Sequence, residues 1–126
     1  MTDLLIQNAS MVNEGRQFAG DLRIRGDRIH AIGPALLARP GEKVLNANGR
    51  LLLPGVIDAQ VHFREPGMEY KGGFDTEPAA AVAGGVTSYL EVPNTKPGTL
   101  TAEILEDKYR LAAGRSRANF GFYFGA

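Results

Sequence analysis

One stretch of the chain, residues 54–67, combines the pattern of a β-strand with a high density of polar side chains. It runs Pro-Gly-Val-Ile-Asp-Ala-Gln-Val-His-Phe-Arg-Glu-Pro-Gly. Successive strand side chains point to opposite faces, which predicts one apolar and one polar face. Polar groups are costly to bury without partners, so a polar row at the end of a parallel strand is typical of a functional site. We therefore expect a buried strand that ends in a polar site. The predicted polar row consists of Asp58, Gln60, His62 and Arg64.

Residues 1–53 contain short strand patterns separated by turns. Residues 21–24 and 28–32 alternate polar with apolar side chains around Gly26-Asp27, which predicts a hairpin. Such spacing of short strands predicts part of a small β-sandwich domain. The other short apolar segments are residues 4–6, 11–12, 43–45 and 51–53.

From residue 54 to residue 126, strand and helix patterns alternate. A first helix is expected to begin near Thr76 and to end at Gly84-Gly85, because glycine accepts a left-handed stop. A second helix is expected to begin at Thr101, to run to about Ala113 and to stop at Gly114. Alternation of this kind predicts an α/β fold with a parallel sheet. The two further strands are predicted at residues 86–92 and 118–124.

Three motifs together resemble the amidohydrolase superfamily, and within it most closely the dihydroorotases. Residues 58–67 are similar to an Asp-x-His-x-His strand followed by Arg-Glu-Pro-Gly, and residues 92–97 contain the second hallmark, Pro-Asn-Thr. Residues 79–87 are also similar to the family. The resemblance implies the first part of a (β/α)8 TIM-type metal-dependent hydrolase barrel, preceded by a small β-sandwich segment.

The chain is short for the barrel that this resemblance implies. It has 126 residues, whereas a (β/α)8 barrel typically needs about 250. The residues after Pro54 have room for roughly three strands and two helices. We therefore expect the chain to be the N-terminal part of a larger protein, inactive alone, with the catalytic acid–base and further metal ligands beyond Ala126.

The resemblance implies roles for four residues at the ends of the first two barrel strands. His62 matches a metal-binding histidine, and Gln60 stands where the family has another. An amide oxygen is a weaker zinc ligand than an imidazole, so Gln60 is expected to be a weak ligand or a hydrogen-bond partner. Arg64 and Asn94 match the positions that bind a substrate carboxylate, and guanidinium and amide donors suit that group. The expected cofactor is zinc, as one or two ions.

Each of these residues also has a structural alternative. His62 could be a core histidine satisfied by a neighbour, and Asn94 could be a turn residue. Arg64 could form an ordinary ion pair with Glu65. Asp58 is expected to orient the strand end or a ligand rather than to bind metal, and a plain hydrogen bond to a nearby loop is the alternative. The other charged residues near the motif are expected to be solvated loop or cap residues, namely Glu65, Lys71, Asp75 and Glu77.

The activity implied for the intact protein is zinc-dependent, reversible interconversion of dihydroorotate and N-carbamoyl-L-aspartate in pyrimidine biosynthesis. Two alternatives remain open at this point. One is another cyclic amidohydrolase, of allantoinase or hydantoinase type, although Arg64 together with Asn94 favours a substrate that bears a carboxylate. The other is a catalytically silent dihydroorotase-like subunit, which Gln60 alone favours. The expected partners are a second copy of the protein or aspartate transcarbamoylase.

Composition excludes several other classes. Lysine and arginine total 14, as do aspartate and glutamate, and there is no basic run, so nucleic-acid binding has no support. Cysteine is absent, which excludes disulfides and cysteine metal sites. No apolar run approaches the ~20 residues of a membrane helix, and the N-terminus lacks the features of a signal peptide. A soluble, cytoplasmic protein is the expectation.

Overall fold

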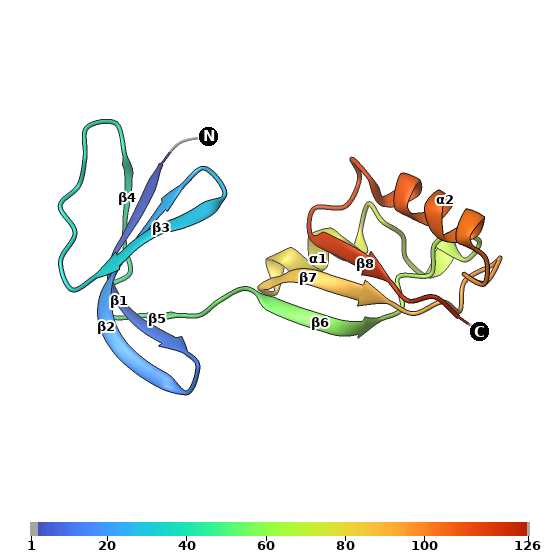
Figure 1. Cartoon of the computed structure of the whole chain (residues 1–126), viewed down its shortest axis with the longest axis horizontal. Coiled ribbons are helices and arrows are strands. Elements are labelled where there is room, and N and C mark those ends of the chain that lie inside the picture. The colour runs from blue at the N-terminus through green and yellow to red at the C-terminus, as the bar shows by residue number, and fades with distance from the viewer. Residues whose placement is uncertain (1–2, 126) are drawn as a thin grey trace. The chain divides into compact units, whose positions relative to one another are not determined.

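Residues 3–125 are described by a computed structural model, in which the chain divides into two units (Figure 1). The strand unit is Met1–Pro54, and the α/β unit is Gly55–Ala126. Each has its own cluster of buried apolar residues.

The strand unit is built on a single five-stranded sheet. Its order is β3-β2-β1-β4. Strand β5 also pairs with β1 in parallel, as β4 does, but with residues nearer the end of β1. The predicted hairpin around Gly26-Asp27 is present as the antiparallel pair of β2 and β3. The strands are β1 (Leu4–Asn13), β2 (Arg16–Arg25), β3 (Arg28–Gly33), β4 (Lys43–Asn46) and β5 (Leu51–Leu52).

The first strand is one continuous element rather than the two short segments expected from the sequence. Asn8 adopts a φ of +57°, and the register against β2 shifts between Ile6 and Ala9. The amide of Asn8 donates to Asp21 Oδ1 at 2.8 Å. The bulge accommodates Asn8 as an extra residue, so the strand continues beyond it. Ile6 and Ala9, on either side of the bulge, belong to the same apolar cluster.

An ion pair is buried in the strand unit. Arg23 Nε donates to Glu42 Oε1 at 2.6 Å, and Nη2 donates to Glu42 Oε2 at 3.1 Å and to the carbonyl of Leu37 at 2.6 Å. The two side chains are 5% and 2% exposed. The hydrogen bond from Arg23 holds the pKa of the Glu42 carboxyl below its usual value. The pair ties β2 to the segment that leads into β4.

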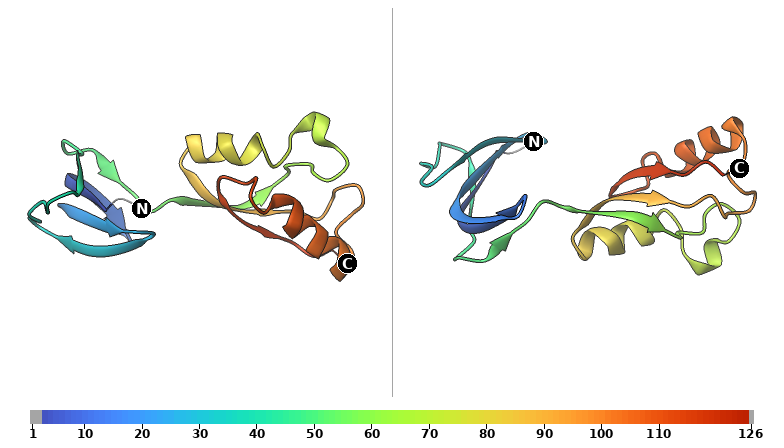
Figure 2. Two further views of the ribbon diagram at one scale, coloured as in Figure 1. Left: turned by 90° about the horizontal axis from the view of Figure 1, so that it is seen from above. Right: turned by 60° about the horizontal axis from the view of Figure 1, so that its bottom comes forward.

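The α/β unit contains a parallel three-stranded sheet, in the order β6-β7-β8. Helix α1 packs against β7, and helix α2 packs against β8 (Figure 2). The sequence predicted this alternation of strands and helices. The elements are β6 (Val56–Val61), the 3-10 turn η1 (Glu69–Lys71), α1 (Glu77–Ala83), β7 (Val86–Glu91), α2 (Ala102–Ala112) and β8 (Asn119–Phe122).

The helix boundaries follow local signals. Thr101 Oγ1 accepts the amide of Ile104 at 3.3 Å and caps α2, as predicted. Thr76 holds the N-cap position of α1 without a capping hydrogen bond. Gly85 and Gly114 follow the two helices with φ values of +92° and +77°, the left-handed stops that only glycine adopts easily.

The expectation of a buried first strand is wrong for most of β6. Residues 56–60 are all exposed, with Ile57 at 67%, and only Val61 is buried. The reason is that, within residues 3–125, β6 lies at the edge of the sheet and neither helix packs against its faces.

The core of the α/β unit lies where β7 and β8 meet the helices. Phe74 and Tyr89 are its largest fully buried side chains. Ala81 of α1 and Ala112 of α2 contact the same cluster, so both helices pack on one core. The buried cluster consists of Val61, Phe63, Phe74, Tyr89, Ala112 and Ala118.

Neither helix in residues 3–125 has the length and apolar character needed to cross a membrane.

Candidate active site

Two loops that follow neighbouring strands lie against each other at the carboxyl end of the parallel sheet. One is residues 62–67, after β6, and the other is residues 92–99, after β7. The amide of Lys96 donates to the carbonyl of Pro66 at 3.0 Å. Gly67 has a φ of +88°, and a Cβ there would lie 2.0 Å from the carbonyl oxygen of Lys96. Glycine permits this close approach, which joins the two loops.

The structure brings two of the predicted site residues into contact. His62 Nδ1 and Asn94 Oδ1 are 3.2 Å apart, and both residues are exposed. Because an amide oxygen can only accept, this hydrogen bond requires the imidazole to carry its proton on Nδ1. In the neutral imidazole, Nε2 then carries the lone pair that can bind a metal ion, and the amide nitrogen of Asn94 remains a donor. His62 is therefore not a core histidine in this chain.

Arg64 adopts a left-handed backbone conformation shortly after the strand ends. Its φ is +70°, and its amide donates to Glu91 Oε1 at 3.1 Å. The side chain is half-buried. Within residues 3–125, its guanidinium has no hydrogen bond or ion pair, and Glu65 binds Arg115 instead. The structure does not form the Arg64–Glu65 pair, and the guanidinium remains available to a ligand.

Gln60 and Asp58 lie on the exposed part of β6. Asp58 Oδ1 accepts the amide of Gln60 at 3.0 Å, so this carboxylate orders the strand locally. The side-chain amide of Gln60 has no hydrogen bond to residues 3–125 and is open to a ligand. The regular alternation expected for the polar row does not extend to Arg64, because β6 ends at Val61 and its register shifts after Asp58.

The described residues do not make a metal centre by themselves. Residues 3–125 hold no group of three or more His, Cys, Asp or Glu side chains that could bind a metal ion. His62 and Gln60 therefore provide, at most, part of a metal site.

Sequence reasoning missed a buried acid beneath these loops. Glu91, the last residue of β7, is 1% exposed, and Lys108 of α2 is fully buried. Lys108 Nζ lies 3.1 Å from Glu91 Oε2, but that oxygen has no well-directed hydrogen bond. Burial raises the pKa of the Glu91 carboxyl and lowers the pKa of the Lys108 ammonium. The alternation of side chains along the strand could have indicated that Glu91 is buried, because Glu91 lies on the same face of β7 as the apolar Tyr89.

A second charge network holds the start of the loop after β6. Glu65 is 5% exposed, which contradicts the expectation of a solvated residue. Its Oε1 accepts from Arg115 Nη1 at 2.6 Å, and its Oε2 accepts the amide of Phe74 at 2.8 Å. Arg115 Nε also donates to Asp75 Oδ1 at 3.1 Å, and this bond lowers the pKa of the Asp75 carboxyl. The network links the loop to the segment that follows α2.

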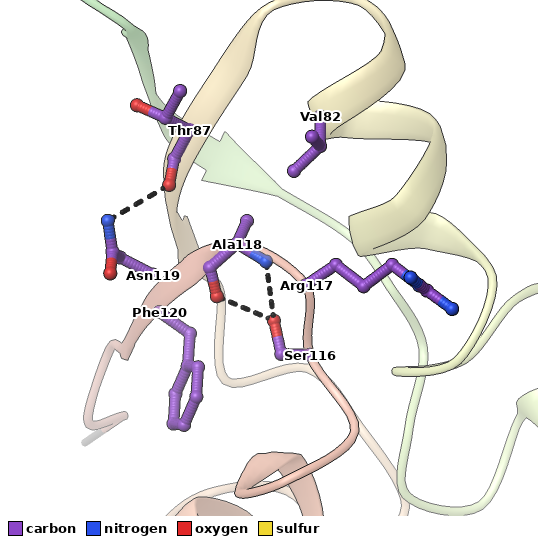
Figure 3. Close-up of a pocket in the computed structure, with 7 residues that line it drawn as sticks. All are labelled: Val82, Thr87, Ser116, Arg117, Ala118, Asn119 and Phe120. Atoms are coloured by element: carbon purple, nitrogen blue, oxygen red, sulfur yellow. Dashed lines mark hydrogen bonds between the residues drawn. The ribbon is translucent and has the colours of Figure 1, made fainter. Parts of the chain in front are cut away.

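A pocket in the α/β unit lies elsewhere. Figure 3 shows this pocket at the amino ends of β7 and β8. Its volume is about 630 Å³. Asn119 Nδ2 spans the two strands and donates to the carbonyl of Thr87 at 3.2 Å. Because the strands are parallel, the pocket is at the end of the sheet opposite His62 and Asn94. It does not include the predicted site residues.

Comparison with known proteins now assigns the family. The family model described as Dihydro-orotase-like matches residues 49–123, which include both site loops. The chain belongs to this family. It is 39% identical over 124 residues to an allantoinase of Deinococcus radiodurans and 43% identical over 102 residues to a dihydroorotase of Halobacterium salinarum. Those matches cover 98% and 80% of the chain but only 28% and 24% of the two relatives.

Solved structures give the same result for the fold. The chain aligns with L-hydantoinase (dihydropyrimidinase) from Arthrobacter aurescens with a TM-score of 0.92 and 26% identity. This alignment covers 99% of the chain and 28% of the hydantoinase. A D-hydantoinase from Thermus sp. aligns with a TM-score of 0.82 and 31% identity. The predicted α/β fold class, the first part of an amidohydrolase barrel, is confirmed. Of the small β-sandwich predicted before it, the described residues form one sheet. The matched proteins are cyclic amidohydrolases named allantoinase, dihydroorotase and hydantoinase, and the comparisons do not distinguish among these three activities.

Proposed function

We propose that this chain is the first part of a dihydroorotase. The intact protein would catalyse the reversible, zinc-dependent hydrolysis of dihydroorotate to N-carbamoyl-L-aspartate, a step of pyrimidine biosynthesis. The observation that carries the proposal is the unpaired guanidinium of Arg64, in a loop at the same end of the sheet as the His62–Asn94 contact.

The proposed role of Arg64 is to bind the substrate carboxylate. Both dihydroorotate and N-carbamoyl-L-aspartate carry such a group, and a guanidinium can bind it through two parallel hydrogen bonds. The amide nitrogen of Asn94, whose oxygen is engaged by His62, would donate to the same ligand. These contacts would fix the position of the cyclic amide relative to the end of β6.

Zinc is the proposed cofactor, as one or two ions. His62 would bind it through Nε2, and the exposed amide of Gln60 would be a weak ligand. This donor set fits part of a catalytic zinc site, which typically has three protein ligands, so other ligands would come from outside the described residues. When bound, zinc lowers the pKa of a water molecule and polarises a carbonyl. Asn94 would hold the imidazole of His62 in the tautomer that ligation needs.

A second candidate is an allantoinase. The match to the Deinococcus radiodurans allantoinase extends over 98% of the chain, against 80% for the Halobacterium salinarum dihydroorotase. Allantoin carries no carboxylate, however, and would leave the guanidinium of Arg64 without the partner that it suits best.

The deciding experiment is a substrate panel on the purified intact protein. Dihydroorotate, N-carbamoyl-L-aspartate, allantoin and hydantoin would each be supplied with zinc and after chelation. The proposal expects zinc-dependent turnover of the first two compounds only. Turnover of allantoin alone would establish the second candidate. No turnover by a folded, zinc-loaded protein would instead favour a silent subunit.

The proposal also includes assembly and location. The intact protein would form a homodimer or associate with aspartate transcarbamoylase, in the cytoplasm. Size-exclusion chromatography with and without that enzyme would test the assembly, and elution as an unchanged monomer would contradict it.

A further inference from the structure

The backbone of Arg64 is held by a buried carboxylate from the neighbouring strand. A φ of +70° is sparsely populated for a residue with a Cβ, and such a conformation persists only where its surroundings fix it. Glu91 Oε1 accepts the amide of Arg64 at 3.1 Å. This contact joins residues 27 positions apart in the sequence. It links the loop after β6 to the end of β7.

Lys108 holds the carboxylate of Glu91 in place. Its Nζ lies 3.1 Å from Glu91 Oε2, 3.5 Å from Thr99 Oγ1 and 4.9 Å from the centre of the Phe122 ring. The ammonium therefore engages the second carboxylate oxygen by charge, and Oε1 is left to accept from Arg64. An unpaired buried carboxylate would be strongly disfavoured, so Lys108 is what allows an acid at this position.

Glu91 acts through Arg64 and does not itself reach the site. It shares a face of β7 with Tyr89, and both residues are 1% exposed. Tyr89 belongs to the apolar cluster that packs against the helices, so this face is closed to a ligand.

We propose that Glu91 is a positioning residue, which fixes the backbone of Arg64 so that its guanidinium binds the substrate carboxylate, with Lys108 as its counter-ion. This inference rests on the proposed function of Arg64 as the carboxylate-binding residue. It assigns the buried pair to ligand binding rather than to stability.

Two charge-neutral double variants of the intact protein separate these roles. In Glu91→Gln/Lys108→Met, the side-chain amide oxygen can still accept the amide of Arg64. In Glu91→Met/Lys108→Met, the acceptor is absent, and both variants lack the ion pair. The matched pair therefore differs in the one hydrogen bond under test. Two readouts are needed, namely hydrogen exchange of the Arg64 amide and the values of KM and kcat for N-carbamoyl-L-aspartate.

The Glu91→Met/Lys108→Met variant should lose about 10-fold or more of the protection at Arg64 and show a KM raised by about 10-fold, with kcat changed much less. The Glu91→Gln/Lys108→Met variant should remain within about 3-fold of the wild type in both readouts. Equal behaviour of the two variants would overturn the inference. Loss of protection with an unchanged KM would also overturn it, because the contact would then be structural only.

Failure of the proposed function gives a different result. A wild-type protein that neither binds nor turns over N-carbamoyl-L-aspartate refutes the proposed function, and the inference falls with it. An active wild type with two indistinguishable double variants refutes the inference alone.

Discussion

The strand unit and the α/β unit each bury an ion pair, and the two pairs differ in how their charges are satisfied. Arg23 binds both oxygens of Glu42 and donates to a backbone carbonyl as well. Lys108 approaches one oxygen of Glu91 without a directed hydrogen bond. The pKa of the Glu42 carboxyl is lowered by its partner, whereas burial raises the pKa of the Glu91 carboxyl.

This difference indicates that the two ion pairs have different roles. Two hydrogen bonds from a guanidinium offset the loss of hydration of Glu42, so the first pair serves the fold of its unit. A buried pair with weak geometry is poor evidence of stability, because an apolar pair of similar size is often as stable. The second pair lies beneath the proposed site and engages the backbone of Arg64. We infer that the second pair serves ligand binding at the proposed site.

The largest expected effect comes from breaking the second pair. Lys108→Met leaves Glu91 buried without a counter-ion and should destabilise the α/β unit by about 3–5 kcal/mol. The control is Glu91→Gln/Lys108→Met, which should be close to neutral. The free energy of opening at the β7 amides, from hydrogen exchange in the intact protein, measures both. A Lys108→Met protein as stable as the wild type would contradict the burial of a charged Glu91.

Gly67→Ala tests the contact between the two loops. The new Cβ would meet the carbonyl oxygen of Lys96 in a left-handed conformation. It should cost about 1–3 kcal/mol and lower the protection of the Lys96 amide. Gly26→Ala is the control for backbone conformation, because its φ is +60° and no atom lies within 4 Å of the added Cβ. Equal losses at both positions would show that the loops do not constrain each other.

The smallest effect is the acid sensitivity of the first pair. Because the pKa of Glu42 is lower when folded than when unfolded, its stabilising contribution is present above the unfolded pKa and is lost as pH falls through the folded pKa. Unfolding followed between pH 6 and pH 2 (the range in which carboxyl groups titrate, about 4 for glutamate) should show a shallower loss in Glu42→Gln than in the wild type. Identical acid profiles would mean that the pair does not contribute.

Sequence patterns predicted the elements whose causes are local. The cap at Thr101, the stops at Gly85 and Gly114 and the alternation of strand and helix after residue 54 all depend on neighbouring residues. The sequence analysis placed His62 and Asn94 at the ends of the first two barrel strands, and the structure brings them into contact, although their roles stay predictions.

The features that the sequence did not predict depend on residues far apart in the chain. Arg115 binds Glu65 across 50 positions, and no local pattern distinguishes that acid from a solvated one. The exposure of β6 follows from its place at the sheet edge and from the absence, within residues 3–125, of a helix packed on it. The left-handed turn at Arg64 is accompanied by a hydrogen bond to Glu91, 27 positions away, so the strand alternation drawn from residues 58–64 alone could not have included it.

The central claim is that Arg64 binds a substrate carboxylate, and one measurement tests it most directly. KM and kcat would be compared for N-carbamoyl-L-aspartate with the wild-type protein, Arg64→Met and Arg110→Met. Arg110 is the matched control, since its side chain is 70% exposed on α2 and pairs with Asp107. Arg64→Met should raise KM by about 10- to 100-fold, the loss of one or two charge-assisted hydrogen bonds, while Arg110→Met stays near the wild type. A KM that is the same in all three proteins would contradict the account.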